Sequence, residues 1–216
     1  MSELNVKTTL PKALAAAFGV LALCGILMLA HLWRSEAQAR KLLAALASLD
    51  VGKSTVADVQ LIQERFRPYQ EQTDNSEFRF MVTNQPLAKW KIEPLAFLSG
   101  EVNIRYGKVA GVYILLERQV GSYIRAAVIA ESEDQSPFCD QPYCVGSPIG
   151  KPFIIAHLDA RVTREQKRRI FDLNLSWITR FKGEPKICDL SPNAWEDWKT
   201  QRPDLTADLQ ATYQCP

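Results

Sequence analysis

The chain has 216 residues, of which 47% are hydrophobic, and its 26 Lys and Arg residues nearly balance its 24 Asp and Glu residues. This length accommodates one ordinary domain plus an anchor, and the apolar content is too high for an intrinsically disordered chain. A nucleic-acid-binding domain usually carries a clear basic excess, so the net charge of +2 argues against a nucleic-acid partner.

Residues 13–33 form an uncharged apolar stretch that follows Lys12 and ends at Trp33. A helix of this length is roughly 30 Å long, which matches the thickness of a bilayer core. Pro11 suits the start of a helix, and tryptophan is common at the membrane interface. We therefore predict a signal-anchor: a single-pass transmembrane helix at 13–33 that holds the protein in the lipid bilayer, preceded by a short tail at 1–12.

Two alternatives remain open for this segment. A cleaved signal peptide usually has an apolar run of about 7–15 residues, which is shorter than this one, although Ala37-Gln38-Ala39 resembles a cleavage site. Lipidation of Cys24 is the second alternative, but Leu23 stands where a lipidation box has a small residue.

The chain beyond the anchor contains four cysteines, and an even number suits two disulfide bridges in an oxidising compartment. We predict the pairs Cys139–Cys144 and Cys188–Cys215, with the crossed pairings, free thiols and a zinc site as alternatives. A zinc site usually has paired C-x2-C spacing, which is absent. Basic residues flank both sides of the anchor, so the positive-inside rule does not set the orientation. The cysteines favour a periplasmic or extracellular domain.

Helical patterns follow the anchor. Residues 34–50 predict a juxtamembrane helix with a leucine-rich face, and Gly52 is a typical residue after a helix end. Thr55 and Asp58 predict a capping box that begins a second helix, which Pro68 ends. We therefore expect the globular domain, residues 51–216, to begin with a capped helix.

A period of two then marks the strands. Alternating apolar residues predict strands at 78–82, 102–106, 109–117, 123–130 and 153–159. Residues 85–99 indicate an irregular apolar connector, and residues 131–152 indicate a loop. Strands and helices are clustered rather than alternating, so we predict an α+β fold. In it, an antiparallel sheet of four or five strands packs with two or three helices.

The last third of the chain predicts a long amphipathic helix from Thr163 to Phe181 and a short helix at 192–198. Five basic residues gather near the start of the long helix, where positive charge opposes the helix dipole. That conflict suggests an anion-binding surface for a lipid head group, a polysaccharide or an acidic protein patch, with a solvated charged face as the alternative. The five residues are Arg161, Arg164, Lys167, Arg168 and Arg169.

Two patterns suggest catalysis or cofactor binding without establishing either. Residues 47–54 match a relaxed phosphate-loop pattern, but the segment before them predicts a helix instead of the required strand. His157 shares a strand face with Asp159, which could act as an acid–base pair, but no nucleophile is tied to it. We therefore expect no catalytic residue, cofactor or metal, with an enzyme using the His157/Asp159 face as the alternative.

The segment from Gly52 to Val59, which opens a helix before antiparallel strands, resembles small lipoproteins of the outer-membrane assembly machinery of the SmpA/OmlA type. This chain lacks their lipidation box and the Gly-x-Pro turn after the helix. The overall layout resembles bacterial single-pass envelope proteins that have no assigned activity, so the resemblance implies no catalytic residue. We predict a non-enzymatic, membrane-anchored extracytoplasmic domain that binds a protein or an anionic envelope partner, or supports envelope structure.

Overall fold

The computed structural model describes the backbone of residues 6–71, 74, 76–92, 94–120, 123–132, 143–146, 153–158, 163–179, 186–201 and 215. Side chains are described for most of these residues, but not for 6–13, 120, 123–127, 143–146, 153–158, 166, 187, 190, 194, 197, 198 or 201. The chain divides into two compact units, Met1–Arg34 and Ser35–Pro216. Cys139, Asp159 and Arg161 lie outside the described residues.

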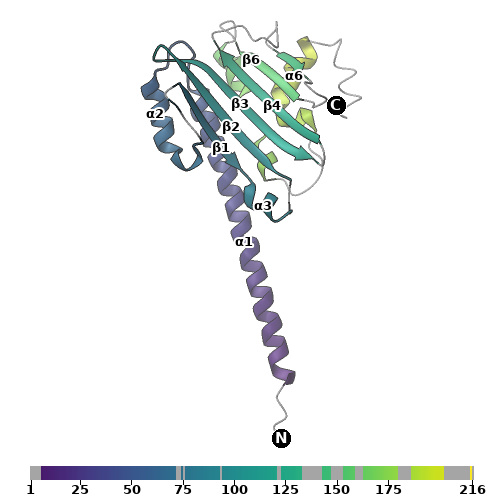
Figure 1. Cartoon of the computed structure of the whole chain (residues 1–216). Helices are drawn as coiled ribbons and strands as arrows, with labels where there is room; N and C mark the ends of the chain where they lie inside the picture. Colours follow the sequence, from purple (N-terminus) through teal and green to yellow (C-terminus); the bar gives the residue numbers. More distant parts are fainter. Residues whose placement is uncertain are drawn as a thin grey trace. The chain divides into compact units, whose positions relative to one another are not determined.

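Helix α1 (Val6–Ala47) contains a stretch that is long and apolar enough to cross a membrane (Figure 1). Most large hydrophobic side chains described in the first unit are exposed instead of packed in a core, so burial in a soluble core does not account for them. The exposed residues are Leu14, Phe18, Val20, Leu21, Leu23, Ile26, Leu27, Leu29 and Trp33.

The second unit is built on a six-stranded sheet with the order β1-β2-β3-β4-β6-β5. Strands β1 to β4 are sequential antiparallel neighbours, β6 runs parallel to β4, and β5 pairs antiparallel with β6. This arrangement confirms the α+β class with a largely antiparallel sheet. The strands are β1 (Glu77–Thr83), β2 (Ala96–Arg105), β3 (Lys108–Val120), β4 (Tyr123–Ser132), β5 (Tyr143–Gly146) and β6 (Phe153–Leu158).

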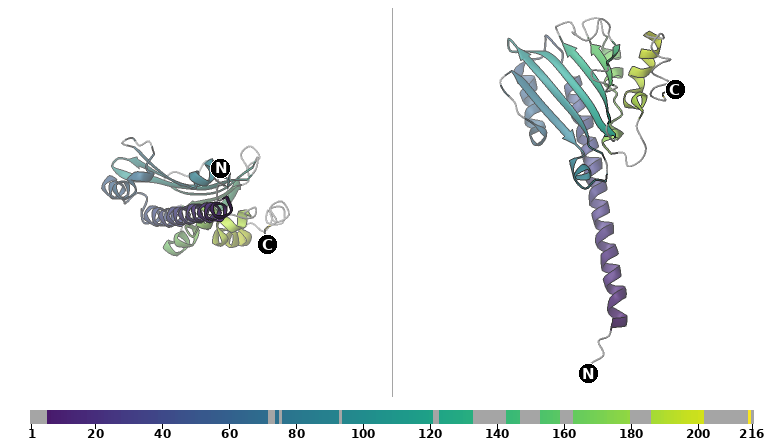
Figure 2. Two further views of the ribbon diagram at one scale, coloured as in Figure 1. Left: turned by 90° about the horizontal axis from the view of Figure 1, so that it is seen from below. Right: turned by 45° about the vertical axis from the view of Figure 1, so that its right-hand side comes forward.

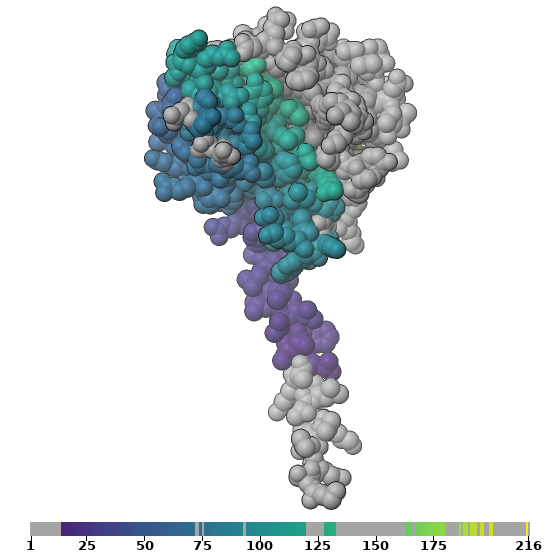
Figure 3. Space-filling model, viewed as in Figure 1, coloured from purple at the N-terminus to yellow at the C-terminus, as the bar shows by residue number. Residues whose placement is uncertain are grey.

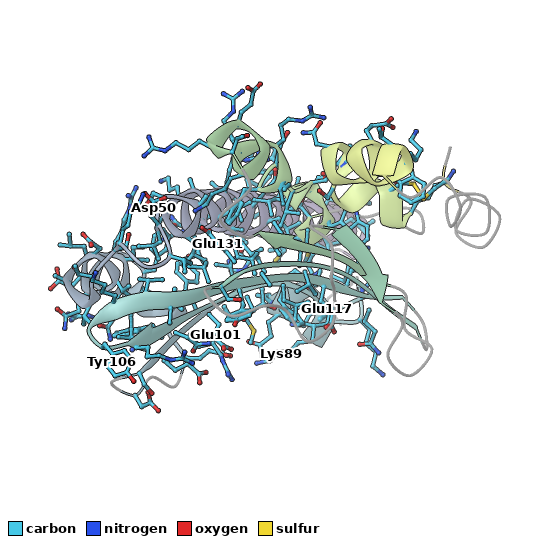
Figure 4. The ribbon with its side chains drawn as sticks, turned by 90° about the horizontal axis from the view of Figure 1, so that it is seen from above. Asp50, Lys89, Glu101, Tyr106, Glu117 and Glu131 are labelled. Atoms are coloured by element: carbon cyan, nitrogen blue, oxygen red, sulfur yellow. A yellow bond between two sulfur atoms is a disulfide. The ribbon has the colours of Figure 1, made fainter. Side chains whose placement is uncertain are left out.

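Helices line one face of the sheet. Figures 2 and 4 show the second half of α1 together with α4 and α6 on this face. Glu101 and Glu117 project from the opposite face, which has no helix layer over β2 and β3 in the described part of the chain (Figures 3 and 4). Besides α1, the helices are α2 (Val56–Arg65), η1 (Arg67–Tyr69), α3 (Gln85–Lys89), α4 (Arg164–Ile170), η3 (Leu175–Ile178), α5 (Ile187–Leu190) and α6 (Pro192–Gln201).

The core lies between the sheet and the C-terminal part of α1. Alternate residues of β1 to β3 point inward, as their alternating burial shows, because strand side chains alternate between the two faces. The juxtamembrane leucines face them, so this stretch of helix belongs to the globular unit. Core members include Leu42, Leu46, Phe80, Leu98 and Ile114, each without measurable exposure.

The predicted long helix from Thr163 to Phe181 is wrong in its length. Helix α4 ends at Ile170, and a separate 3-10 turn, η3, follows at Leu175–Ile178. Between them, the side chain of Asn174 accepts hydrogen bonds from the backbone N–H and the Oγ of Ser176, at 3.3 and 2.6 Å. An asparagine that bonds its own backbone in this way competes with helical hydrogen bonding.

The predicted capping box at Thr55 is present at the start of α2. The Asp58 carboxylate accepts hydrogen bonds from the backbone N–H of Thr55 at 2.7 Å and from its Oγ1 at 2.9 Å. The backbone bond first and the side-chain bond second lower the pKa of Asp58. These bonds satisfy donors that a helix start would otherwise leave unpaired.

Candidate anion-binding groove

A groove of about 840 Å³ lies between the end of α1 and the segment from α4 to η3. Its apolar lining includes Leu43 and Ala47 of α1 together with Phe171 and Leu173, which follow α4. Its charged lining combines acidic and basic residues, with the basic ones in excess. The charged residues are Arg40, Asp50, Arg164, Lys167, Arg168, Arg169 and Asp172.

The groove brings together four of the five basic residues singled out in the sequence. Arg164, Lys167, Arg168 and Arg169 all line it, and Arg40 joins them from α1. Sequence reasoning missed Arg40 as a member of this cluster because it is distant in the chain. Arg40 lies four residues before Ala44 and seven before Ala47, so all three share one face of α1. That this face lines the groove follows only from the packing of α1 against α4.

Lys167 forms interactions within the fold and is not available to a ligand as a free cation. Its Nζ lies 2.6 Å from the Glu131 carboxylate, and it donates a hydrogen bond of 2.7 Å to the backbone carbonyl of Leu49. It also lies 3.9 Å from Asp50 Oδ1. The Lys167 and Glu131 side chains are only 13% and 17% exposed. Lys167 therefore joins α4, β4 and the turn after α1, and its donors are engaged within the fold.

Arg164 and Arg168 are the cations best placed to meet a ligand. Both are exposed, and neither has a hydrogen-bond or ion-pair partner among the described residues. They are four residues apart, so they lie on the same side of the helix. Arg40 is instead paired with Glu36 at 2.9 Å, and Arg169 also has an interaction partner. The available positive charge is thus concentrated on one rim of the groove.

The expected conflict between this cluster and the helix dipole is wrong for most of its members. Because α4 is only seven residues long, Lys167, Arg168 and Arg169 lie in its last turn, where positive charge is favourable. Only Arg164 occupies the start of the helix. Support for anion binding therefore comes from the groove and the unpaired arginines, and not from an unfavourable dipole.

The loop at residues 47–54 is not a phosphate cradle. A helix precedes it, and its amides are used within the fold: Gly52 N–H donates to the Val109 carbonyl at 2.8 Å, and Ser54 N–H donates to the Asp50 carbonyl at 2.8 Å. A phosphate loop needs converging free amides after a strand. The alternative of a helix stop followed by a cap accounts for Gly52, which has a positive φ of 77°.

For His157 the structure describes the backbone but not the side chain. This backbone lies in β6 opposite Ala130 of β4, while Asp159 is outside the described residues. Among the described residues, no group of three or more His, Cys, Asp and Glu side chains is arranged to hold a metal ion. The enzyme alternative gains no geometric support from the described part of the chain.

Cys188 and Cys215 form a disulfide, with their Cα atoms 5.8 Å apart. Both residues are buried members of the hydrophobic core, and Cys188 N–H also donates to the Cys215 sulfur at 3.2 Å. The predicted pair Cys188–Cys215 is therefore present, while the predicted pair Cys139–Cys144 lies outside the described side chains. It joins α5 to the end of the described chain.

Comparison with protein-family models, with characterised proteins and with solved structures finds no match for this chain. The resemblance to SmpA/OmlA-type lipoproteins at Gly52–Val59 therefore stays a prediction from sequence.

Proposed function

We propose that this protein is a non-enzymatic, membrane-anchored binding domain that takes an acidic segment of a partner protein into the groove between α1 and α4. The observation that carries the proposal is the pairing of an apolar groove floor with two unpaired arginines, Arg164 and Arg168, on its rim. Arginine is suited to this role because its planar guanidinium can bind a carboxylate through two parallel hydrogen bonds.

The groove fits a protein segment better than the other anionic partners considered. Leu43, Ala47 and Phe171 give it an apolar floor, which complements aliphatic side chains and offers little to a hydrated polysaccharide. An amphipathic segment with an acidic edge matches both floor and rim, as in other helix-in-groove complexes. The same apolar floor offers little to the hydrated head group of a lipid.

Two features support a tethered, extracytoplasmic location. The apolar part of α1 would hold the chain in the bilayer, with the signal-anchor retained after synthesis. A buried disulfide between Cys188 and Cys215 is typical of a periplasmic or extracellular compartment, because cytosolic thiols are kept reduced. The bilayer and the groove's acidic segment are thus the two partners of the proposed function.

Site-specific photocrosslinking in native membranes tests the groove. A photoreactive phenylalanine analogue replaces Ser48, an exposed residue lining the groove, and the adduct is identified by mass spectrometry. We expect a discrete adduct whose crosslinked peptide is acidic. We expect Arg164→Glu with Arg168→Glu to remove it, since the variant puts repulsion where the carboxylates would bind.

The matched control reverses two exposed lysines outside the groove. Lys53→Glu with Lys108→Glu makes the same change in net charge, and neither residue lines the groove. It should leave the adduct intact. The same analogue at Tyr106, which is 98% exposed in the hairpin turn, should give no such adduct. Capture of a lipid or polysaccharide at Ser48, or an adduct that survives the arginine reversals, would contradict the proposal.

A further inference from the structure

The connector between β1 and β2 presents large apolar side chains to solvent. Trp90 is 66% exposed, Ile92 is 44% exposed and Leu95 is 37% exposed. Lys89 and Lys91 alternate with them, are both exposed, and have no hydrogen-bond or ion-pair partner among the described residues. Glu93 offsets one of these charges in the sequence. A surface cluster of tryptophan and aliphatic side chains is typical of a site that contacts a membrane or another protein.

This connector is held in a defined turn. After α3, the Ile92 N–H donates to the Leu87 carbonyl at 3.0 Å and the Lys91 N–H donates to the Ala88 carbonyl at 3.1 Å. These are the two bonds of a Schellman motif, whose left-handed residue is usually glycine. Here that residue is Lys91, with a φ of 55°. A lysine in this left-handed conformation is strained, whereas a glycine would adopt it without steric cost.

Buried Asn84 closes the other side of the connector. Its Oδ1 accepts from the Ala96 N–H at 2.8 Å, and its Nδ2 donates to the Pro94 carbonyl at 2.9 Å. The Leu95 carbonyl in turn accepts from the Gln119 N–H of β3 at 2.8 Å. The exposed apolar side chains therefore project from an ordered platform, which reduces the entropy lost when they bind a surface.

Within Ser35–Pro216, the connector lies at the same end of the sheet as the start of the unit. Glu36 accepts a hydrogen bond from Thr179 Oγ1 at 3.0 Å. Close by in the chain, the carbonyl of Trp177 accepts from Arg118 at 2.7 Å. Arg118 is paired with Ala96, where the connector ends. The opposite end of the sheet holds the turn after α1, because Gly52 N–H bonds the Val109 carbonyl.

We propose that Trp90, Ile92 and Leu95, with Lys89 and Lys91, form a second membrane contact that rests in the interface of the bilayer holding α1. Ser35 follows Trp33 by only two residues, so at most roughly 7 Å of extended chain separates the first residue of the unit from the end of the apolar stretch. Tryptophan favours the lipid headgroup region, and lysine favours anionic head groups.

Other exposed apolar residues of the unit lack this combination. Tyr106, 98% exposed, is in the hairpin turn at the opposite end of the sheet. Leu61, 66% exposed, stands on α2, which begins beside that same turn because the Val56 N–H bonds the Gly107 carbonyl. Neither is near the point where the unit begins. The proposed contact thus joins exposed apolar groups and positive charge in one segment, at the end of the sheet where the unit begins.

Lipid photolabelling of the full chain in nanodiscs tests this contact. The discs contain phosphatidylcholine, phosphatidylglycerol and a small fraction of phospholipid carrying a diazirine near its head group, and adducts are mapped by peptide mass spectrometry. We expect adducts on residues 89–95 at several times the level found on the peptide containing Tyr106. Trp90→Ala with Ile92→Ser should reduce them to that background, while labelling of the anchor stays unchanged.

Two further variants separate charge from folding. Lys91→Gly keeps the left-handed turn, so the fold should be retained or stabilised, while labelling of 89–95 should fall about fivefold in anionic discs. Lys53→Glu with Lys108→Glu, at the other end of the sheet, should have no effect. Equal labelling of residues 89–95 and the Tyr106 peptide in the wild-type chain would overturn the proposal. The result is independent of groove binding, because the discs contain no partner protein.

Discussion

Leu46 of α1 lies so close to Gly100 of β2 that a Cβ at position 100 would overlap the Leu46 Cδ1 atom. Leu46 is fully buried in the core, so it has no free space into which to move. The helix that continues from the anchor therefore approaches the sheet at a position where only glycine fits. This contact makes the juxtamembrane helix an integral part of the globular unit.

Gly100→Ala should lower the free energy of unfolding by about 1–3 kcal/mol, because overpacking a tight core forces side chains or backbone to shift. Denaturant unfolding of the full chain in detergent, followed by circular dichroism, measures the effect. Ser99→Ala, one residue earlier on the other face of β2, should change the free energy by less than about 0.5 kcal/mol. Equal midpoints for Gly100→Ala and the wild type would show that the helix does not press on the sheet here.

Lys167→Met should destabilise the fold by about 2 kcal/mol, because it leaves the mostly buried Glu131 carboxylate without its cation. Adding Glu131→Gln should restore more than half of the loss, which a double-mutant cycle of unfolding free energies would show. If Lys167→Met were as stable as the wild type, the contacts of Lys167 with Glu131 and Leu49 would not stabilise the fold. Lys167 would then count among the cations available to a ligand.

Reduction of Cys188–Cys215, or the double change to alanine, should cost about 3.5 kcal/mol in the chain-entropy model for a loop of this length. Non-reducing peptide mapping of protein taken from native membranes should recover the two cysteines in one linked pair. Free, readily alkylated thiols at both positions would argue for a cytosolic domain.

The Asp58 cap predicts a pH dependence of defined sign. Hydrogen bonds from Thr55 lower the pKa of Asp58 below its ordinary value of 3.8, so the ionised form favours the folded state. This contribution is present above pH 3.8 and is lost as the pH falls through the lowered pKa. Asp58→Asn should therefore lower the melting temperature at neutral pH, and the difference from wild type should shrink in acid.

Glu64→Gln removes a carboxylate elsewhere on α2 and serves as the control. Its melting temperature should track the wild type at neutral pH. If Asp58→Asn were as stable as Glu64→Gln at pH 7, the capping box would contribute nothing to the fold.

Local patterns predicted most of the elements. The Thr55/Asp58 spacing identified the start of α2, because a capping box depends only on neighbours in the chain. Alternation identified β1, β3, β4 and the second half of β2 in the same way. The expectation of an irregular connector at 85–99 is wrong in part, because this segment contains α3 and the first residues of β2. The break after α4 was missed, because buried Ile170, Leu173 and Trp177 keep a helix-like spacing across it. The hydrogen bonds of Asn174 that accompany the break do not show in an apolar pattern.

Long-range features could not be predicted from such patterns. Strand β5 is four residues long and exists through its pairing with β6, which no local signal specifies. The groove likewise needs Arg40 and Arg168 on adjacent helices, although they are far apart in the sequence. The basic cluster was identified, but which cations are engaged, as Lys167 is, depends on contacts with Glu131 and Leu49.

Equilibrium binding to the groove tests the central claim most directly. The full chain in phosphatidylcholine nanodiscs is titrated against a fluorescent amphipathic peptide with leucines on one helical face and glutamates on the other, and anisotropy is followed at several salt concentrations. We predict salt-sensitive binding that weakens at least tenfold in Arg164→Glu with Arg168→Glu and stays within twofold in Lys53→Glu with Lys108→Glu. Absence of binding to the wild-type chain, or equal losses in the two charge-reversal variants, would contradict the account.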